Sequence, residues 1–182
     1  LRSLVGSEMC IRDSLRDRGR REPRGEDGWV TGPTFTFHHQ WSFAAPREAV
    51  LAALADIDGY PAWWPQVRSV GRLDERSGRA RIRSALPLTL HLVLTREIED
   101  HARGRLRVRL DGDLEGWAQW SVDSDPQGGG ACATFDQDVR VAARWSRAAT
   151  LAPAVLRANH AWMMRQGRRG LARSLSCLLY TS

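Results

Sequence analysis

The strongest constraint on the fold is a succession of alternating apolar and polar residues that fills the middle of the chain. Between Arg68 and Val141 this alternation recurs over short segments separated by turn signals, which is typical of antiparallel strands. In Arg105–Leu110, for example, each arginine is followed by a leucine or valine, as in a strand with one buried and one solvated face. Asp111-Gly112-Asp113 then predicts a hairpin turn. We therefore expect six consecutive antiparallel strands in this region.

One more strand and two short helices precede this region. Thr34–Phe43 alternates and places its aromatic residues and His39 on one face. Pro46 suits the first turn of a helix, because its missing N–H has no partner there in any case. Gly59 and Pro61 end that helix, and the Trp63-Trp64-Pro65 segment predicts a short second helix against the sheet.

A long amphipathic helix follows the last strand. A single layer of helix over one sheet makes an α+β domain, in which the helix must cover the apolar face of the sheet. A strongly bent sheet around such a helix leaves a concave space, the usual place for a small-molecule site. The apolar stripe of the helix consists of Leu156, His160, Met163, Met164, Gly167 and Leu171, and Arg157, Ala161, Arg165, Arg168 and Ala172 lie opposite.

The two ends of the chain resemble a translated sequencing adapter. Cys177–Ser182 back-translates to TGT CTC TTA TAC ACA TCT, and the reverse complement of that DNA reads through Glu8 to Asp13 and into Ser14. We therefore expect residues 1–14 and 175–182 to be adapter-derived and exclude them from the fold. Residues 15–33 are rich in Arg, Gly and Glu, and we expect them to form a disordered leader. The predicted domain is residues 34–174.

Composition limits the remaining functions. All 27 basic residues are arginine, which indicates GC-rich coding more than selection for nucleic-acid binding, so we expect no nucleic-acid partner. Cys132 is the one cysteine outside the ends, which favours a reducing cytoplasmic setting. No apolar run approaches the roughly 20 residues that span a bilayer. His38 and His39 point to opposite faces of a strand and neither HExxH nor CxxC occurs, so we predict no metal and no cofactor.

Three segments of the chain resemble the START-related superfamily called SRPBCC, within it the polyketide cyclase/dehydrase-like group. They are Phe43–Pro46 with its following helix, Tyr60–Val67, and the closing strands and helix from Leu114 to Leu171. The resemblance implies a helix-grip fold, in which a curved antiparallel sheet of about seven strands surrounds a long C-terminal helix and two short helices follow the first strand. It also implies an internal cavity, while the members bind lipids, hormones, quinones or polyketides and only some are catalysts.

Polar residues on the inward faces are the candidates for chemistry. His160 is the candidate acid–base group, because the pKa of a free histidine lies near neutral pH. The alternative is a packing histidine whose nitrogens are bonded to Asn159 or to the backbone. Gln137 interrupts an apolar stripe, so its polar group must hydrogen-bond to the protein, to a buried water or to a ligand. The predicted ligand-binding residues are Trp64, Trp120, Phe135, Gln137, His160, Met163 and Met164, whereas Trp63 is assigned to the core.

Three functions follow as hypotheses. The leading one is binding of a small hydrophobic molecule, lipid-like or aromatic, in an internal cavity. The first alternative is a polyketide cyclase or dehydratase that uses His160 as its acid–base group. The second is a non-catalytic adaptor that uses the arginine-rich face of the last helix.

Overall fold

The computed structural model describes residues 33–84, 86, 88–126, 128–142, 144 and 152–180. In these residues one antiparallel sheet has the strand order β1-β7-β6-β5-β4-β3-β2. The predicted α+β class is confirmed, as is the order of one strand, short helices, six strands and a long helix. The elements are β1 (Thr34–Phe43), α1 (Arg47–Ala55), the 3-10 turn η1 (Ile57–Gly59), α2 (Tyr60–Trp63), β2 (Val67–Arg72), β3 (Ser77–Arg83), β4 (Thr89–Asp100), β5 (Arg105–Gly112), β6 (Leu114–Ser124), β7 (Ala131–Val141) and α4 (Pro153–Tyr180).

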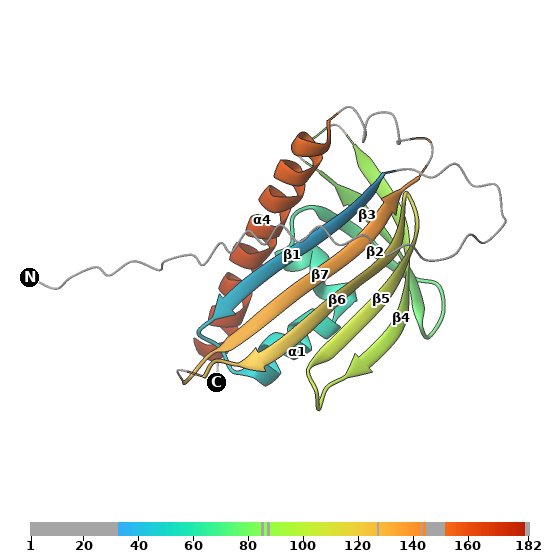
Figure 1. The fold of residues 1–182 in the computed structure, drawn as a ribbon. Helices are drawn as coiled ribbons and strands as arrows, with labels where there is room; N and C mark the ends of the chain where they lie inside the picture. The colour runs from blue at the N-terminus through green and yellow to red at the C-terminus, as the bar shows by residue number, and fades with distance from the viewer. Residues whose placement is uncertain are drawn as a thin grey trace, which may run out of the picture.

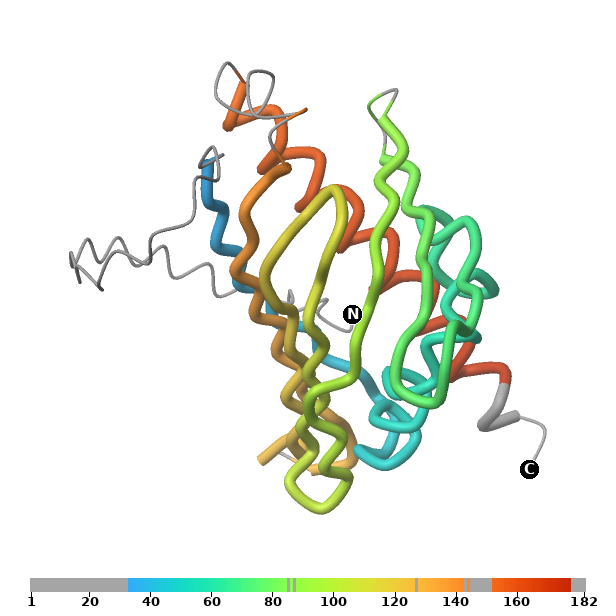
Figure 2. Tube along the Cα trace, turned by 90° about the vertical axis from the view of Figure 1, so that its right-hand side faces the viewer, coloured from blue at the N-terminus to red at the C-terminus, as the bar shows by residue number. Residues whose placement is uncertain are grey.

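The sheet bends around α4. In Figure 2, β1, β7 and β6 lie on one side of the helix and β2 and β3 lie on the other. Two irregularities accompany the bend, because the register shifts between Val67 and Ser69 in β2 and between Arg96 and Ile98 in β4. Such bulges increase the local twist of a strand. The helices α1 and α2 lie on the same side of the sheet as α4 (Figure 1).

Strand β4 carries apolar residues on both of its faces, so its alternation alone does not show which face points inward. In the structure Leu90, Leu92 and Leu94 line the interior beside Leu88, whereas Val93 does not. The even-numbered residues therefore point inward. The register between β4 and β3 determines which face of β4 points inward. Leu92 pairs with Ala80, which is itself a buried residue of the interior face.

The main core lies where α1, α2 and the second half of α4 meet the sheet. Val50, Val122 and Leu171 have no exposed surface there. Helix α4 approaches α2 so closely that a Cβ on Gly170 would lie 1.7 Å from the carbonyl oxygen of Trp63. Glycine is thus required at this contact. Trp63 is buried in this core, as predicted.

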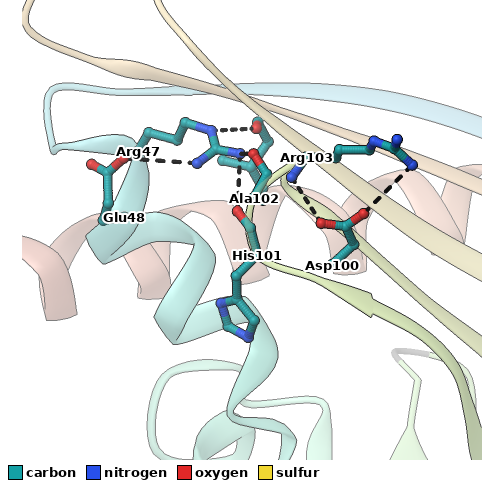
Figure 3. Close-up of polar contacts among 7 residues, drawn as sticks. Arg47, Glu48, Asp100, His101, Ala102 and Arg103 are labelled. Carbon is teal, nitrogen blue, oxygen red and sulfur yellow. Dashed lines mark hydrogen bonds and ion pairs between the residues drawn. The ribbon is translucent and has the colours of Figure 1, made fainter.

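Arg47 ties α1 to the sheet. Its Nε donates to the carbonyl oxygen of Val122 at 3.0 Å, and its Nη2 donates to those of His101 and Ala102 at 3.2 and 3.1 Å (Figure 3). These bonds cap the turn between β4 and β5, where Asp100 also accepts from the backbone N–H of Arg103 at 2.9 Å. The guanidinium therefore satisfies three carbonyl groups at the end of the molecule that holds the core.

Helix α4 continues past the predicted domain end at Ser174. It extends to Tyr180, and Leu175 is buried in the main core with Leu171. The predicted boundary therefore does not coincide with the end of the helix. Residues 1–32, 181 and 182 are among those outside the described residues. The expectations of a disordered leader over residues 15–33 and of adapter-derived segments at 1–14 and 175–182 stay predictions.

Candidate functional site

A cavity of about 270 Å³ lies between the first half of α4 and the bent sheet. Its walls are mostly aliphatic and aromatic side chains from all seven strands, α4 and the α1–α2 region. Every residue predicted to bind a ligand lines this cavity. These residues are Trp64 near α2, Trp120 on β6, Phe135 and Gln137 on β7, and His160, Met163 and Met164 on α4.

His160 is held by hydrogen bonds at both ring nitrogens. Its Nε2 lies 3.0 Å from Oε1 of Gln137, and its Nδ1 lies 3.1 Å from Nε2 of His39. An amide oxygen can only accept, so Nε2 of His160 carries the proton and donates it. In the neutral ring Nδ1 then accepts from the N–H of His39. The hydrogen bonds therefore run in one direction, from His39 through His160 to Gln137.

The environment keeps His160 neutral. Burial, and then the neighbouring His39, lower the pKa of His160 from 6.5 to about 3. The ring also stacks on Phe37, with 3.7 Å between the ring centroids. Burial lowers the pKa of His39 as well, in the same direction. The alternative interpretation of His160 as a packing histidine named the wrong partners, because the two partners are Gln137 and His39.

Trp64 and Trp120 form an aromatic end wall. Trp64 Nε1 donates to the carbonyl oxygen of Met163 at 3.1 Å, which fixes the indole against α4. Trp120 packs on Trp41 and Phe135, with centroid distances of 4.6 and 4.8 Å. Both indoles therefore contribute area to the cavity while their other edges belong to the core.

The opposite part of the lining contains charged residues that are already paired. Arg96 lies 2.6 Å from Glu99, and Nε of Arg107 donates to Glu97 at 3.0 Å. A hydrogen bond from His101, partly opposed by burial and aided by Arg96, lowers the pKa of Glu99. These pairs give the cavity a charged margin on β4 and β5, two or three strands across the sheet from Gln137 on β7.

His39 and Phe37 belong to the site but were absent from the predicted set. Both lie on the inward face of β1, and Phe37 lines the cavity directly while His39 stands behind His160. The alternation of Thr34–Phe43 had already placed both residues inward. That signal identified the face, but it could not show which residue of α4 would pack against it.

Three further observations concern metal ligands, membrane helices and the arginines of α4. Among residues 33–142, 144 and 152–180, less the few left undescribed, no group of three His, Cys, Asp or Glu side chains is placed to hold a metal ion. In the same part of the chain, no helix is both long and apolar enough to cross a bilayer. The arginines on the outer face of α4 are exposed: Arg157, Arg165, Arg168, Arg169 and Arg173.

The fold and the cavity together define a helix-grip domain with an interior cavity. The chain belongs to the family described as polyketide cyclase/dehydrase and lipid transport, whose model matches residues 34–175. No curated protein sequence matches the chain significantly.

Solved structures agree on the fold. The ZhuI aromatase/cyclase of Streptomyces sp. R1128 is 18% identical, with a TM-score of 0.63 over 79% of this chain and 94% of that one. A START superfamily protein of Mycobacterium smegmatis is 14% identical, with a TM-score of 0.63 over 79% of this chain and 98% of that one. A protein of Thermus thermophilus is 16% identical, with a TM-score of 0.64 over 79% of this chain and 98% of that one. At these identities the likeness concerns the fold alone.

Proposed function

We propose that this protein binds a small hydrophobic molecule, lipid-like or aromatic, in the cavity between α4 and the sheet. The observation that carries the proposal is the lining, which is mostly aliphatic and aromatic and includes the neutral hydrogen-bonded pair of His160 and Gln137. Concave sites that are largely apolar, with a few placed polar groups, are the usual form of small-molecule sites. The family description, which includes lipid transport, points in the same direction.

Filling the cavity tests the proposal. Ala118 lines the cavity from β6, and its neighbour Gln119 points to the other face of the sheet. We expect the wild type to bind Nile red and to retain small apolar molecules in native mass spectrometry. Ala118→Phe should weaken dye binding at least about tenfold, since the ring occupies the ligand volume. Gln119→Phe adds the same ring outside the cavity and should bind as the wild type does.

Two results would contradict the proposal. One is a wild-type protein that binds neither Nile red nor any member of a panel of fatty acids, sterols and polycyclic aromatics. The other is an Ala118→Phe protein that folds and binds the dye with unchanged affinity.

Catalysis by His160 receives less support from the same geometry. With a pKa of about 3, His160 stays neutral near neutral pH, and with both nitrogens engaged it has neither an imidazolium proton to donate nor a free lone pair to accept one. The cyclase or dehydratase alternative therefore stays a prediction. Its test is His160→Ala, which would have to abolish turnover of a substrate that the wild type converts. The adaptor alternative likewise rests only on the exposed arginines of α4.

A further inference from the structure

The polar cluster of the cavity ends in a hydrogen-bond donor that has no partner. Gln137 accepts at Oε1 from His160, so its amide nitrogen Nε2 is the remaining polar atom of the side chain. Within the described part of the chain, no hydrogen bond from that nitrogen is present. Gln137 is only 8% exposed, and its side chain lines the cavity. A buried amide N–H₂ without an acceptor is costly, and each such group in a native protein calls for an explanation.

The nitrogen retains contact with the cavity space. Of the described side chains, Gln66 holds the one fully enclosed oxygen or nitrogen that lacks a hydrogen bond, and Gln137 is not in that state. The residues paired with Gln137 across the sheet are Ala118 on β6 and Phe37 on β1. Both line the cavity, and the alanine leaves room beside the amide for another molecule.

The orientation of the amide is fixed from behind. His39 donates to His160, and His160 donates to Gln137, so the carbonyl end of the amide is occupied and the N–H₂ end points away from the histidines. Hydrogen bonds that run in one direction polarise one another, which strengthens the last donor. The histidines thus serve as positioning residues for Gln137.

Because His39, His160 and Gln137 are all uncharged, they favour a neutral acceptor atom on the ligand over a charged one. Burial holds His160 and His39 in their neutral forms. The charged residues of the lining lie on β4 and β5 and are already paired, Arg96 with Glu99 and Arg107 with Glu97. A carboxylate or phosphate next to Gln137 would be desolvated without a compensating cation. A neutral carbonyl oxygen would lose much less hydration free energy on entering the cavity.

We infer that Gln137 is the specificity-determining residue of the cavity and that the ligand is an apolar molecule with a neutral carbonyl oxygen, which accepts from Nε2 of Gln137. The inference rests on the proposed function and adds the chemical class of the ligand. Gln137 rejects a hydrocarbon of the same shape because its donor would stay unpaired.

A pair of probes that differ only in the carbonyl group tests the inference. Fluorenone and fluorene have the same tricyclic outline, with C=O in one and CH₂ in the other. Wild type should bind fluorenone about 3- to 10-fold more tightly than fluorene, the range expected for one net hydrogen bond. Gln137→Met keeps the length of the side chain and a weak acceptor for His160 but removes the donor. It should bind both probes with the affinity that wild type has for fluorene.

A matched control and a spectroscopic readout complete the experiment. Asp138→Asn changes the adjacent residue on the outer face of β7 and should keep the preference for fluorenone. The carbonyl stretch of bound fluorenone should lie at lower wavenumber in wild type than in heptane, and this readout needs no variant. Equal affinity of wild type for the two probes, an unshifted carbonyl stretch, or a preference that survives in Gln137→Met would overturn the inference while both probes still bind. Failure of wild type to bind either probe would overturn the inference and the proposed function together.

Discussion

The two halves of α4 have different neighbours in the fold. Its first half, from Leu156 to Met164, faces the cavity and carries the polar side chain of His160 on the inner stripe. Its second half, from Gly170 to Leu175, packs closely against α2 and the core. The same helix therefore borders the cavity along its first half and a filled core along its second half. We therefore expect substitutions in the first half to change the shape of the cavity. Substitutions in the second half should change the packing of the domain and hence its stability.

The contact between Gly170 and Trp63 should be the most sensitive point in the packed half. A Cβ at position 170 would lie 1.7 Å from a backbone carbonyl oxygen, which cannot rotate away. We expect Gly170→Ala to lower the free energy of unfolding by about 3 kcal/mol or more, measured by urea denaturation. Gly71→Ala is the control, since a Cβ at Gly71 meets nothing within 4 Å, and it should change stability by less than about 0.5 kcal/mol. Equal effects at the two glycines would contradict the close packing.

Truncation of one leucine in each half compares them directly. Leu171 is fully buried in the core, whereas Leu156 is partly exposed and lines the cavity. Leu171→Ala should cost about 3 kcal/mol, because it removes contacts and leaves a new void. Leu156→Ala should cost about 1 kcal/mol, because one side of that leucine already faces empty space. The comparison of the halves would fail if the two variants had the same midpoint of denaturation.

The pH dependence of stability should come from the cavity half. The pKa of His160 is about 3 in the folded protein, against about 6.5 in the unfolded chain. Below pH 6.5 the unfolded state therefore binds a proton that the folded state does not, so stability is complete above that pH and falls as the pH drops from 6.5 towards 3. The slope approaches about 1.4 kcal/mol per pH unit for this histidine, and the lowered pKa of His39 acts in the same direction.

The variant His160→Met should flatten this part of the profile. Exposed His91 on β4 supplies the control, and His91→Gln should leave the slope between pH 7 and pH 5 unchanged. Urea denaturation at half-unit pH intervals measures both profiles. An unchanged slope in His160→Met would show that the buried histidine does not control the acid response.

The sequence predicted most of the fold because alternation and helical spacing are local signals. Strand alternation placed Trp120, Phe135 and Gln137 inward, and the helical stripe placed His160 and Met163 beside them. For the site, the sequence predicted which residues face the interior but not which of them contact one another. The pairing of His39 with His160 depends on the register of β1 with β7 and on the height of α4 above the sheet, neither of which periodicity specifies. Whether these residues bind a ligand stays a prediction.

The smallest effect on stability is expected at Gly167, one turn before Gly170. A Cβ there would lie 2.7 Å from the ring of Trp64, but that ring borders the cavity and can move into it. Alanine also favours a helix by about 1 kcal/mol over glycine, which offsets part of the clash. We expect Gly167→Ala to change the free energy of unfolding by less than about 1 kcal/mol.

The same variant should weaken ligand binding, because the displaced indole takes up cavity volume and its hydrogen bond to the carbonyl oxygen of Met163 is strained. Nile red affinity together with near-ultraviolet circular dichroism of the tryptophans measures this displacement. Gly167→Ala and Gly170→Ala are thus the same chemical change on one helix, three residues apart. If Gly167→Ala unfolded the domain as readily as Gly170→Ala, the packed half would begin at Gly167 rather than at Gly170. If it left dye binding untouched, Trp64 would be a core residue rather than a wall of the cavity.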